Sequence, residues 1–345
     1  MRKGFSSFCL LFAMIATSVV FNSCRREDEP VSRERVIYVA GEVNGIATLW
    51  RNGVAQRLST MNSFAGDVYV SRNNVIYVVG SEQNTQGVWV ATLWRNGVAQ
   101  RLGGGIYNSH AGSIAISNNN VYVAGNERYA DGIWQNARLW RNGVIQKLEE
   151  SEGDFPSHAS SVFVSGNNVY VAGRANNRAV FWRNGVIQHL SLTPDGHNNT
   201  ASSVFVSNNN VYVAGRETDG VRWGSHTMLW RNGMPQKISN GEAFHIQKNG
   251  NNIYIAGTSG GAATLWRNRV AQHLTATREG GWAGTSEDIA FDVHISGNDI
   301  FVVGRELKGW NAERSAFDFY ATLWINGVSQ RLSSERSQAM AVFVR

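Results

Sequence analysis

The feature that most constrains the fold of this chain is the sevenfold recurrence of two short motifs. A Tyr-Val-Ala-Gly-like run is followed each time by a Leu-Trp-Arg-Asn-Gly-like run. The glycines of the first motif are Gly41, Gly80, Gly125, Gly173, Gly215, Gly257 and Gly304. The tryptophans of the second are Trp50, Trp94, Trp140, Trp182, Trp230, Trp266 and Trp324. A period of about 45 residues built from short strands is typical of a propeller, in which one supersecondary unit repeats around an axis.

One repeat, residues 203–239, contains four short runs rich in β-branched and aromatic residues, separated by turn residues. An Asn-Gly pair between the third and fourth runs predicts a type I′ hairpin, which needs positive φ at both central residues. This pair begins at Asn52, Asn96, Asn142, Asn184, Asn232 and Asn326. Arg269 follows Asn268 in place of glycine, so we expect strain or another turn type there. Pairing across the hairpin places Trp94 opposite Ala99.

The two ends of the repeat array complement each other. The first repeat starts at Val36 without a preceding Val-Phe-Val run, and residues 341–345 supply such a run with nothing after it. We therefore predict an all-β, seven-bladed β-propeller of four-stranded antiparallel blades over residues 36–345. The C-terminal strand completes blade 1 and closes the ring, which removes open sheet edges. Because the repeated tryptophans lie in mid-strand, we interpret them as core residues between blades.

Residues 1–23 have the features of an export signal: a short basic start, an apolar run and a small residue before Cys24. The apolar run is too short for a confident membrane span. The segment resembles a bacterial lipoprotein signal, of the kind found in Gram-negative, Bacteroidetes-like species. That resemblance implies removal of residues 1–23 and lipidation of Cys24. The alternative is an ordinary secretory signal with an incidental cysteine.

Residues 24–35 are charged and nearly free of large apolar groups, which predicts a tether. Glu27, Asp28 and Glu29 resemble the export signal that sends some Gram-negative lipoproteins to the cell surface. This resemblance implies an outer-membrane location and favours surface display. Loss of the signal would also remove Cys9, so the domain is expected to fold without a disulfide.

The formal charge of +6 does not come from a block of basic residues. Lysine and arginine are spread over all seven repeats, so the sequence does not indicate a nucleic-acid or acidic-membrane partner. We expect a monomer without a cofactor.

Variation between repeats is concentrated on one side of the predicted ring. Antiparallel strands place alternate connections at opposite ends of a blade, and the connections at one end are short and nearly uniform. The long connections at the other end include residues 81–90, 126–136, 216–227 and 305–320. Functional residues concentrate on such loops over a rigid scaffold. Our ligand-binding candidates on this face are Trp89, Trp134, Trp223, Trp282, Trp310, Tyr107, Tyr129, His110, His158, Arg216 and Arg305.

No strong catalytic or metal-binding motif is present in the sequence. Acidic residues on the variable face could pair across the mouth of a propeller as in a glycosidase, but solvated loop charge is the simpler interpretation. His245 and His294 are predicted to share one equivalent position on innermost strands, where Phe163, Phe205 and Phe343 stand elsewhere. We interpret them as polar replacements near the channel, with metal binding as the alternative.

These observations favour a non-catalytic, lipid-anchored binding protein that uses its loop-rich aromatic face to hold a glycan or a protein segment of the envelope. Aromatic rings can stack on the apolar faces of sugars, and the glycan preference rests on analogy with envelope lipoproteins. Two alternatives stay open. One is a glycan-cleaving propeller enzyme, a glycosidase or lyase, and the other is a structural or assembly scaffold of the cell envelope.

Overall fold

The computed structural model describes residues 35–128, 135–149, 156–190, 199–218, 224–277 and 288–345. The chain divides into the units Met1–Glu34 and Arg35–Arg345, and only the second is described. The predicted signal, Cys24 and nearly all of the tether therefore lie outside the described residues. No helix within the described ranges is long and apolar enough to cross a membrane.

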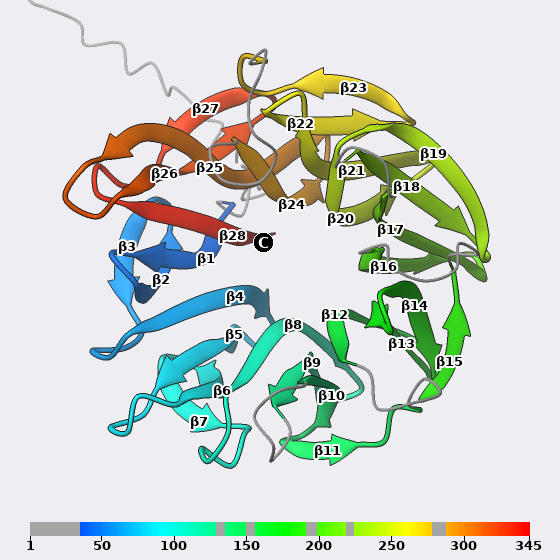
Figure 1. Ribbon diagram of the computed structural model, residues 1–345, viewed down its shortest axis with the longest axis horizontal. Coiled ribbons are helices and arrows are strands. Elements are labelled where there is room, and N and C mark those ends of the chain that lie inside the picture. Colours follow the sequence, from blue (N-terminus) through cyan, green and yellow to red (C-terminus); the bar gives the residue numbers. More distant parts are fainter. Residues whose placement is uncertain (1–34, 129–134, 150–155, 191–198, 219–223, 278–287) are drawn as a thin grey trace, which may run out of the picture. The chain divides into compact units, whose positions relative to one another are not determined.

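The described unit is a seven-bladed β-propeller whose blades are four-stranded antiparallel sheets, as the repeats predicted (Figure 1). Blade 1 combines β28 (Ser337–Val344), β1 (Ile37–Val43), β2 (Ile46–Arg51) and β3 (Val54–Arg57). Blade 2 combines β4 (Ser63–Val70), β5 (Ile76–Gln83), β6 (Trp89–Arg95) and β7 (Val98–Arg101). Blade 3 combines β8 (Ser109–Ser117), β9 (Asn120–Arg128), β10 (Gln135–Arg141) and β11 (Val144–Gln146).

The remaining blades follow the same order from the axis outward (Figure 1). Blade 4 combines β12 (Ser157–Ser165), β13 (Asn168–Ala175), β14 (Arg178–Arg183) and β15 (Val186–His189). Blade 5 combines β16 (Thr200–Ser207), β17 (Asn210–Thr218), β18 (Ser225–Arg231) and β19 (Met234–Asn240). Blade 6 combines β20 (Glu242–Asn249), β21 (Asn252–Ser259), β22 (Ala262–Arg267) and β23 (Val270–His273). Blade 7 combines β24 (Ile289–Ser296), β25 (Asp299–Asn311), β26 (Ala316–Ile325) and β27 (Val328–Arg331).

The C-terminal strand closes the ring as predicted. β28 pairs antiparallel with β1, and Ile37 lies opposite Val344. Beyond that pair, Val36 N donates to Arg345 O at 2.9 Å and Arg345 N donates to Val36 O at 3.0 Å. Blade 1 is therefore built from both ends of the described unit, and ring closure depends on main-chain hydrogen bonds between them.

The Asn-Gly hairpins also form as predicted, with φ of 49° at Asn96 and 81° at Gly97. Trp94 lies opposite Ala99, in the expected register. The structure adds a reason for asparagine: Asn96 Oδ1 accepts a hydrogen bond from Ile76 N at 2.9 Å, where the second strand of the blade begins. The same contact is present in each of the other six blades, where the acceptors are Asn52, Asn142, Asn184, Asn232, Asn268 and Asn326.

The one exception to the Asn-Gly pair keeps the same turn. Asn268 has φ of 50° and Arg269 has φ of 73°. A left-handed conformation costs an L-residue with a Cβ atom roughly 1–2 kcal/mol. Of the two outcomes predicted for this position, the structure shows strain and an unchanged turn geometry.

The hydrophobic core lies between the blades, as the mid-strand tryptophans predicted. Trp94 of blade 2 is fully buried in a cluster with Tyr38 and Leu49 of blade 1. Six further clusters of the same kind occupy the other blade interfaces. The repeated indole rings therefore hold neighbouring blades together and are not available to a ligand.

Candidate functional site

A bulge in each innermost strand creates the lining of the axial channel. In blade 2 the pairing of β4 with β5 shifts register between Ala65 and Asp67, so two successive residues are directed toward the axis. The bulged residues of the seven blades are Gly66, Gly112, Ser160, Ser202, Phe244, Phe291 and Met340. They line a small hollow of about 110 Å³ on the side of the long connections.

The bulge explains the recurring glycine of the first sequence motif. A Cβ atom at Gly80 would lie 1.9 Å from the main-chain oxygen of Phe64, which precedes the bulge. The other six glycines of the motif have the same obstruction, at 1.8–2.0 Å from a main-chain oxygen of the innermost strand. No Cβ fits at such a distance, so the glycine and the bulge require each other.

The residues that follow the bulge form a ring of positions that we call the clamp positions: Asp67, Ser113, Ser161, Ser203, His245, Asp292 and Ala341. Most of them accept a hydrogen bond from the main chain of the next blade. Asp67 Oδ2 accepts from Ile114 N at 2.8 Å, and Ser113 Oγ accepts from Val162 N at 3.2 Å. The same link joins Ser161 to Val204, Ser203 to Ile246 and Asp292 to Val342. These residues bind the blades to one another around the axis.

Three of the clamp positions are ionisable and influence one another. His245 Nδ1 lies 2.6 Å from Asp292 Oδ1. Burial raises the pKa of Asp67 to about 7, and the charge of Asp292 adds to this rise. Burial alone would raise the pKa of Asp292, but the adjacent His245 lowers it overall. Burial lowers the pKa of His245, but Asp292 and Asp67 outweigh this effect and the pKa rises overall.

The predicted equivalence of His245 and His294 is wrong. His245 lies opposite Ala256, whereas His294 lies opposite Phe301, two residues further along the strand. Gln247 is the residue of blade 6 that corresponds to His294, and its Oε1 accepts from Ile295 N at 2.8 Å. The two histidines lie at different distances from the glycine of the first motif: His294 lies ten residues before Gly304, and His245 lies twelve residues before Gly257. Because the bulge is present in both strands, this difference of two residues persists in the register. His294 does occupy the predicted phenylalanine position, and its ring lies 5.1 Å from that of Phe343.

A wider hollow of about 340 Å³ opens on the side of the short turns. Its walls combine the clamp positions with an outer ring of residues that includes Tyr69, Phe163, Phe205 and Phe343. Among the described residues, no three His, Cys, Asp or Glu side chains are grouped so that they could hold a metal ion. The channel is thus lined by clamping polar groups at its centre and by aromatic rings at this end.

The opposite end of the channel lies toward the long connections. It is bordered by the residues of the second strand that follow the motif glycine and by the residues of the innermost strand that pair with them. We call this border the rim, and define it by His110, His158, Arg174, Arg216, Glu242 and Arg305. Residues of neighbouring blades contact one another along it. Ser81 Oγ lies 2.9 Å from His110 Nδ1, Arg216 pairs with Glu242, and Arg305 donates to Gln338 Oε1 at 3.0 Å.

The rim combines guanidinium groups with histidines that stay neutral. Burial, with further contributions from Arg174 and His110, lowers the pKa of His158 to about 4. Burial also lowers the pKa of His110, aided by Arg128. Arg174 lies near enough to Arg216 for the second charge to add to the effect of burial in lowering the pKa of Arg174. The rim therefore carries positive charge at neutral pH that comes from arginine and not from histidine.

Aromatic rings accompany these charges. The guanidinium carbon of Arg305 lies 4.0 Å from the ring centroid of Phe319 and 5.7 Å from that of Phe291. The ring of Trp89 lies 6.1 Å from that of His110. Cation–π contacts of this kind fix the plane of a guanidinium group and leave its N–H edges to other partners.

The sequence-predicted candidates divide into three groups. Trp89, His110, His158, Arg216 and Arg305 lie at or beside the rim, in strands and not in the loops where they were expected, because strand pairing continues past the glycine motif. Two others lie elsewhere: Tyr107 is 38% exposed in the link before β8, and Trp310 is 59% exposed against Phe317 near the end of the β25–β26 hairpin. The remaining four, Tyr129, Trp134, Trp223 and Trp282, lie outside the described residues.

Sequence reasoning missed Arg174, Glu242, Phe291 and the two clamp carboxylates, Asp67 and Asp292. A usable signal existed for the first: Arg174, Arg216 and Arg305 each follow a glycine of the first motif directly. No comparable signal marked Phe291, since its orientation depends on the bulge.

No protein-family model matches the sequence, and no curated protein sequence matches it. Solved structures of similar fold include a puromycin-hydrolyzing peptidase of Mycobacterium tuberculosis, with 10% identity, TM-score 0.50 and coverage of 89% of this chain and 52% of that one. An acylaminoacyl peptidase of Pyrococcus horikoshii has 13% identity, TM-score 0.48 and coverage of 87% and 51%. The extracellular domain of a candidate one component system of B. thetaiotaomicron has 11% identity, TM-score 0.45 and coverage of 79% and 37%. The chain spans about half or less of the length of these structures, and at such identities the likeness concerns the fold alone.

Proposed function

We propose that this protein is a non-catalytic binding protein of the bacterial envelope, and that its rim and loop-rich face hold a glycan. The observation that carries the proposal is the gathering of three arginines and several aromatic rings around one end of the axial channel. Arg305 lies against two phenylalanine rings, and Trp89 lies beside His110. Guanidinium groups can bind the hydroxyl and carboxylate oxygens of a sugar, while flat rings can stack on its apolar faces.

The binding interpretation is favoured over a catalytic one by the state of the channel carboxylates. Both oxygens of Asp67 accept main-chain hydrogen bonds, from Val68 N at 2.7 Å and Ile114 N at 2.8 Å. Asp292 is held in the same way by Val293 N and Val342 N, each at 2.7 Å. Carboxylates whose oxygens are already occupied are better suited to joining blades than to transferring protons to a substrate.

The test is a glycan array with the full-length chain, followed by calorimetry on any ligand found. Trp89→Ala should weaken binding by about tenfold, the loss expected when an aromatic contact at the centre of a site is removed. Trp89→Phe should restore most of the affinity because a ring remains. Met234→Ala, at an exposed position of β19, is the matched control and should bind like the parent chain.

Other outcomes would favour the alternatives. Turnover of the bound glycan, abolished by one carboxylate substitution at the rim, would make the protein an enzyme. Absence of glycan binding together with a stable protein partner would favour recognition of a protein segment or a scaffold role.

We further propose that Cys24 carries the lipid anchor, on the basis of the signal-like sequence before it. Cys24→Ala should move the protein from the detergent-rich to the aqueous phase in a phase-partition experiment. Partition of the variant with the parent chain would contradict lipidation at this residue.

A further inference from the structure

The outer hairpins of the propeller carry basic charge and no acidic charge. Each hairpin runs from the end of the third strand of a blade to the end of the Val-Ala-Gln-Arg-like run. They comprise residues 51–57, 95–101, 141–147, 183–189, 231–237, 267–273 and 325–331, which we call the basic belt. The belt contains 12 of the 32 lysines and arginines and none of the 26 aspartates and glutamates.

The belt is open to solvent. Every residue of β3, β7, β23 and β27 is exposed. Among the described residues, none of the belt arginines or lysines forms an ion pair with a carboxylate. Six of the seven hairpins begin with an arginine that lies over a buried tyrosine, with Arg51 5.9 Å from the Tyr38 ring and Arg95 5.6 Å from the Tyr77 ring. The stacking orients the guanidinium group by its face, so its N–H edges stay accessible.

The propeller joins these separate charges into one surface. Along the sequence the belt residues occur in pairs, roughly one pair per repeat, which does not suggest a polyanion partner. Figure 1 shows the outermost strands β3, β7, β11, β15, β19, β23 and β27 following one another around the perimeter of the ring. The charges therefore form a circular track that no linear reading of the sequence would reveal.

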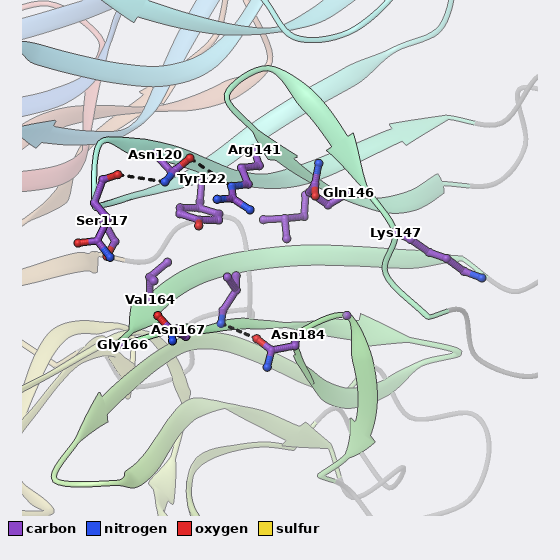
Figure 2. Close-up of a pocket in the computed structure, with 14 residues that line it drawn as sticks. Ser117, Asn120, Tyr122, Arg141, Gln146, Lys147, Val164, Gly166, Asn167 and Asn184 are labelled. Atoms are coloured by element: carbon purple, nitrogen blue, oxygen red, sulfur yellow. Dashed lines mark hydrogen bonds between the residues drawn. The ribbon is translucent and has the colours of Figure 1, made fainter.

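A recess interrupts the belt between blades 3 and 4 (Figure 2). It has a volume of about 480 Å³ and is lined by Arg141, Lys147 and Gln146 of the belt and by amide side chains such as Asn120, Asn167 and Asn184. The recess coincides with a local break in the repeat. β11 has only three residues, after which the chain crosses to blade 4, where Glu149 N donates to Gly185 O at 2.7 Å.

We propose that the basic belt binds an acidic polysaccharide that runs along the perimeter of the propeller. Arginine and lysine bind carboxylate or sulfate groups, and the amides of asparagine and glutamine suit sugar hydroxyls. A repeating surface fits a repeating polymer, because many weak equivalent contacts sum to appreciable avidity. The belt contains no Phe, Tyr or Trp, so it lacks the stacking platforms that single-stranded nucleic acid requires. A curved outer wall also suits a flexible chain better than a flat membrane.

This surface is separate from the rim, and the two proposals can fail independently. The test uses the full-length protein, with heparin and polygalacturonate as polyanions and neutral dextran as control. The belt variant combines Arg57→Gln, Arg101→Gln and Lys147→Gln, on β3, on β7 and just after β11. These side chains are exposed on three successive blades. The matched variant combines Arg72→Gln, Lys248→Gln and Lys308→Gln, which removes the same charge outside the belt.

The parent chain should bind both polyanions at low salt and release them toward 1 M salt, where the Debye length falls to about 3 Å. The belt variant should bind at least about tenfold more weakly, since each exposed ion pair contributes up to about fivefold. The matched variant should stay close to the parent chain, and Trp89→Ala should leave heparin binding intact. Equal losses in the two triple variants, unchanged binding in the belt variant, or tighter binding of oligo(dT) or anionic vesicles than of either polysaccharide would overturn the proposal.

Discussion

The buried carboxyl group of Asp67 should make the stability of the propeller depend on pH in a defined direction. Burial and the charge of Asp292 raise the pKa of Asp67 from 3.8 to about 7. Because the folded-state pKa exceeds the unfolded-state value, the protonated group contributes stability that is complete below pH 3.8. This contribution falls by about 1.4 kcal/mol per pH unit as the pH rises to about 7, a loss of about 4 kcal/mol.

Asp67→Asn removes this titration and should therefore remove its share of the pH dependence. Asparagine offers one carbonyl oxygen where the carboxyl group receives two main-chain hydrogen bonds. Its amide group would face one of the two N–H donors, at a cost of about 1–3 kcal/mol that does not vary with pH. The informative quantity is therefore the change in the free-energy difference between variant and parent chain, measured by urea unfolding from pH 4 to pH 8.

As the pH rises, the free energy of unfolding of Asp67→Asn should increase relative to that of the parent chain. This relative increase should level off above about pH 7. The same substitution at Asp292 is the matched control, because the adjacent His245 lowers the pKa of that carboxyl group despite burial. Its stabilising contribution is present above pH 3.8 and lost as the pH falls, so Asp292→Asn should destabilise the protein most at neutral pH. Parallel pH profiles for Asp67→Asn and the parent chain would refute the reasoning.

Three further substitutions test the frame of the propeller. Gly80→Ala should prevent folding, because its Cβ would lie 1.9 Å from a main-chain oxygen. Gly104→Ala is the control, since its Cβ would meet nothing within 4 Å, and it should shift the melting temperature little. Equal behaviour of the two variants in soluble expression and thermal melting would contradict the role of the bulge. Arg269→Gly should stabilise the chain by about 1 kcal/mol in denaturant unfolding by relieving a φ of 73°, and an unchanged midpoint would show that the turn is not strained. Trp182→Phe should lower the free energy of unfolding by about 1 kcal/mol more than Trp94→Phe. The reason is that the Trp182 indole donates a hydrogen bond to Glu149 O at 2.8 Å, whereas the Trp94 indole donates none. A larger loss of stability at Trp94 would contradict this interpretation.

The sequence predicted the frame well because each of its signals is local. Asn96 and Gly97 determine a turn through their own positive φ angles, and that turn sets the register that places Trp94 opposite Ala99. Closure by residues 341–345 could be predicted because a strand missing at one end was present at the other.

The site was only partly predictable. Arg216 and Arg305 were identified as candidates, but Arg174 was not, although it follows the same glycine motif. His245 was assigned to the wrong register position, because it lies twelve residues before the glycine of its repeat, whereas His294 lies ten residues before its own. Whether the candidates bind a ligand stays a prediction.

The sequence by itself determined the strands, the turns, the number of blades and the identity of the core residues. Each of these depends on contacts within a repeat or on the repetition itself. Only the tertiary structure decided which residues of different blades meet: the clamp positions around the axis, the rim at one end and the basic belt along the perimeter. The physical reason is ring closure, which brings together positions about 45 residues apart or more. The sevenfold recurrence therefore determines the scaffold. Closure of the blades into a ring places charged residues that are far apart in the sequence next to one another, in the rim and in the basic belt.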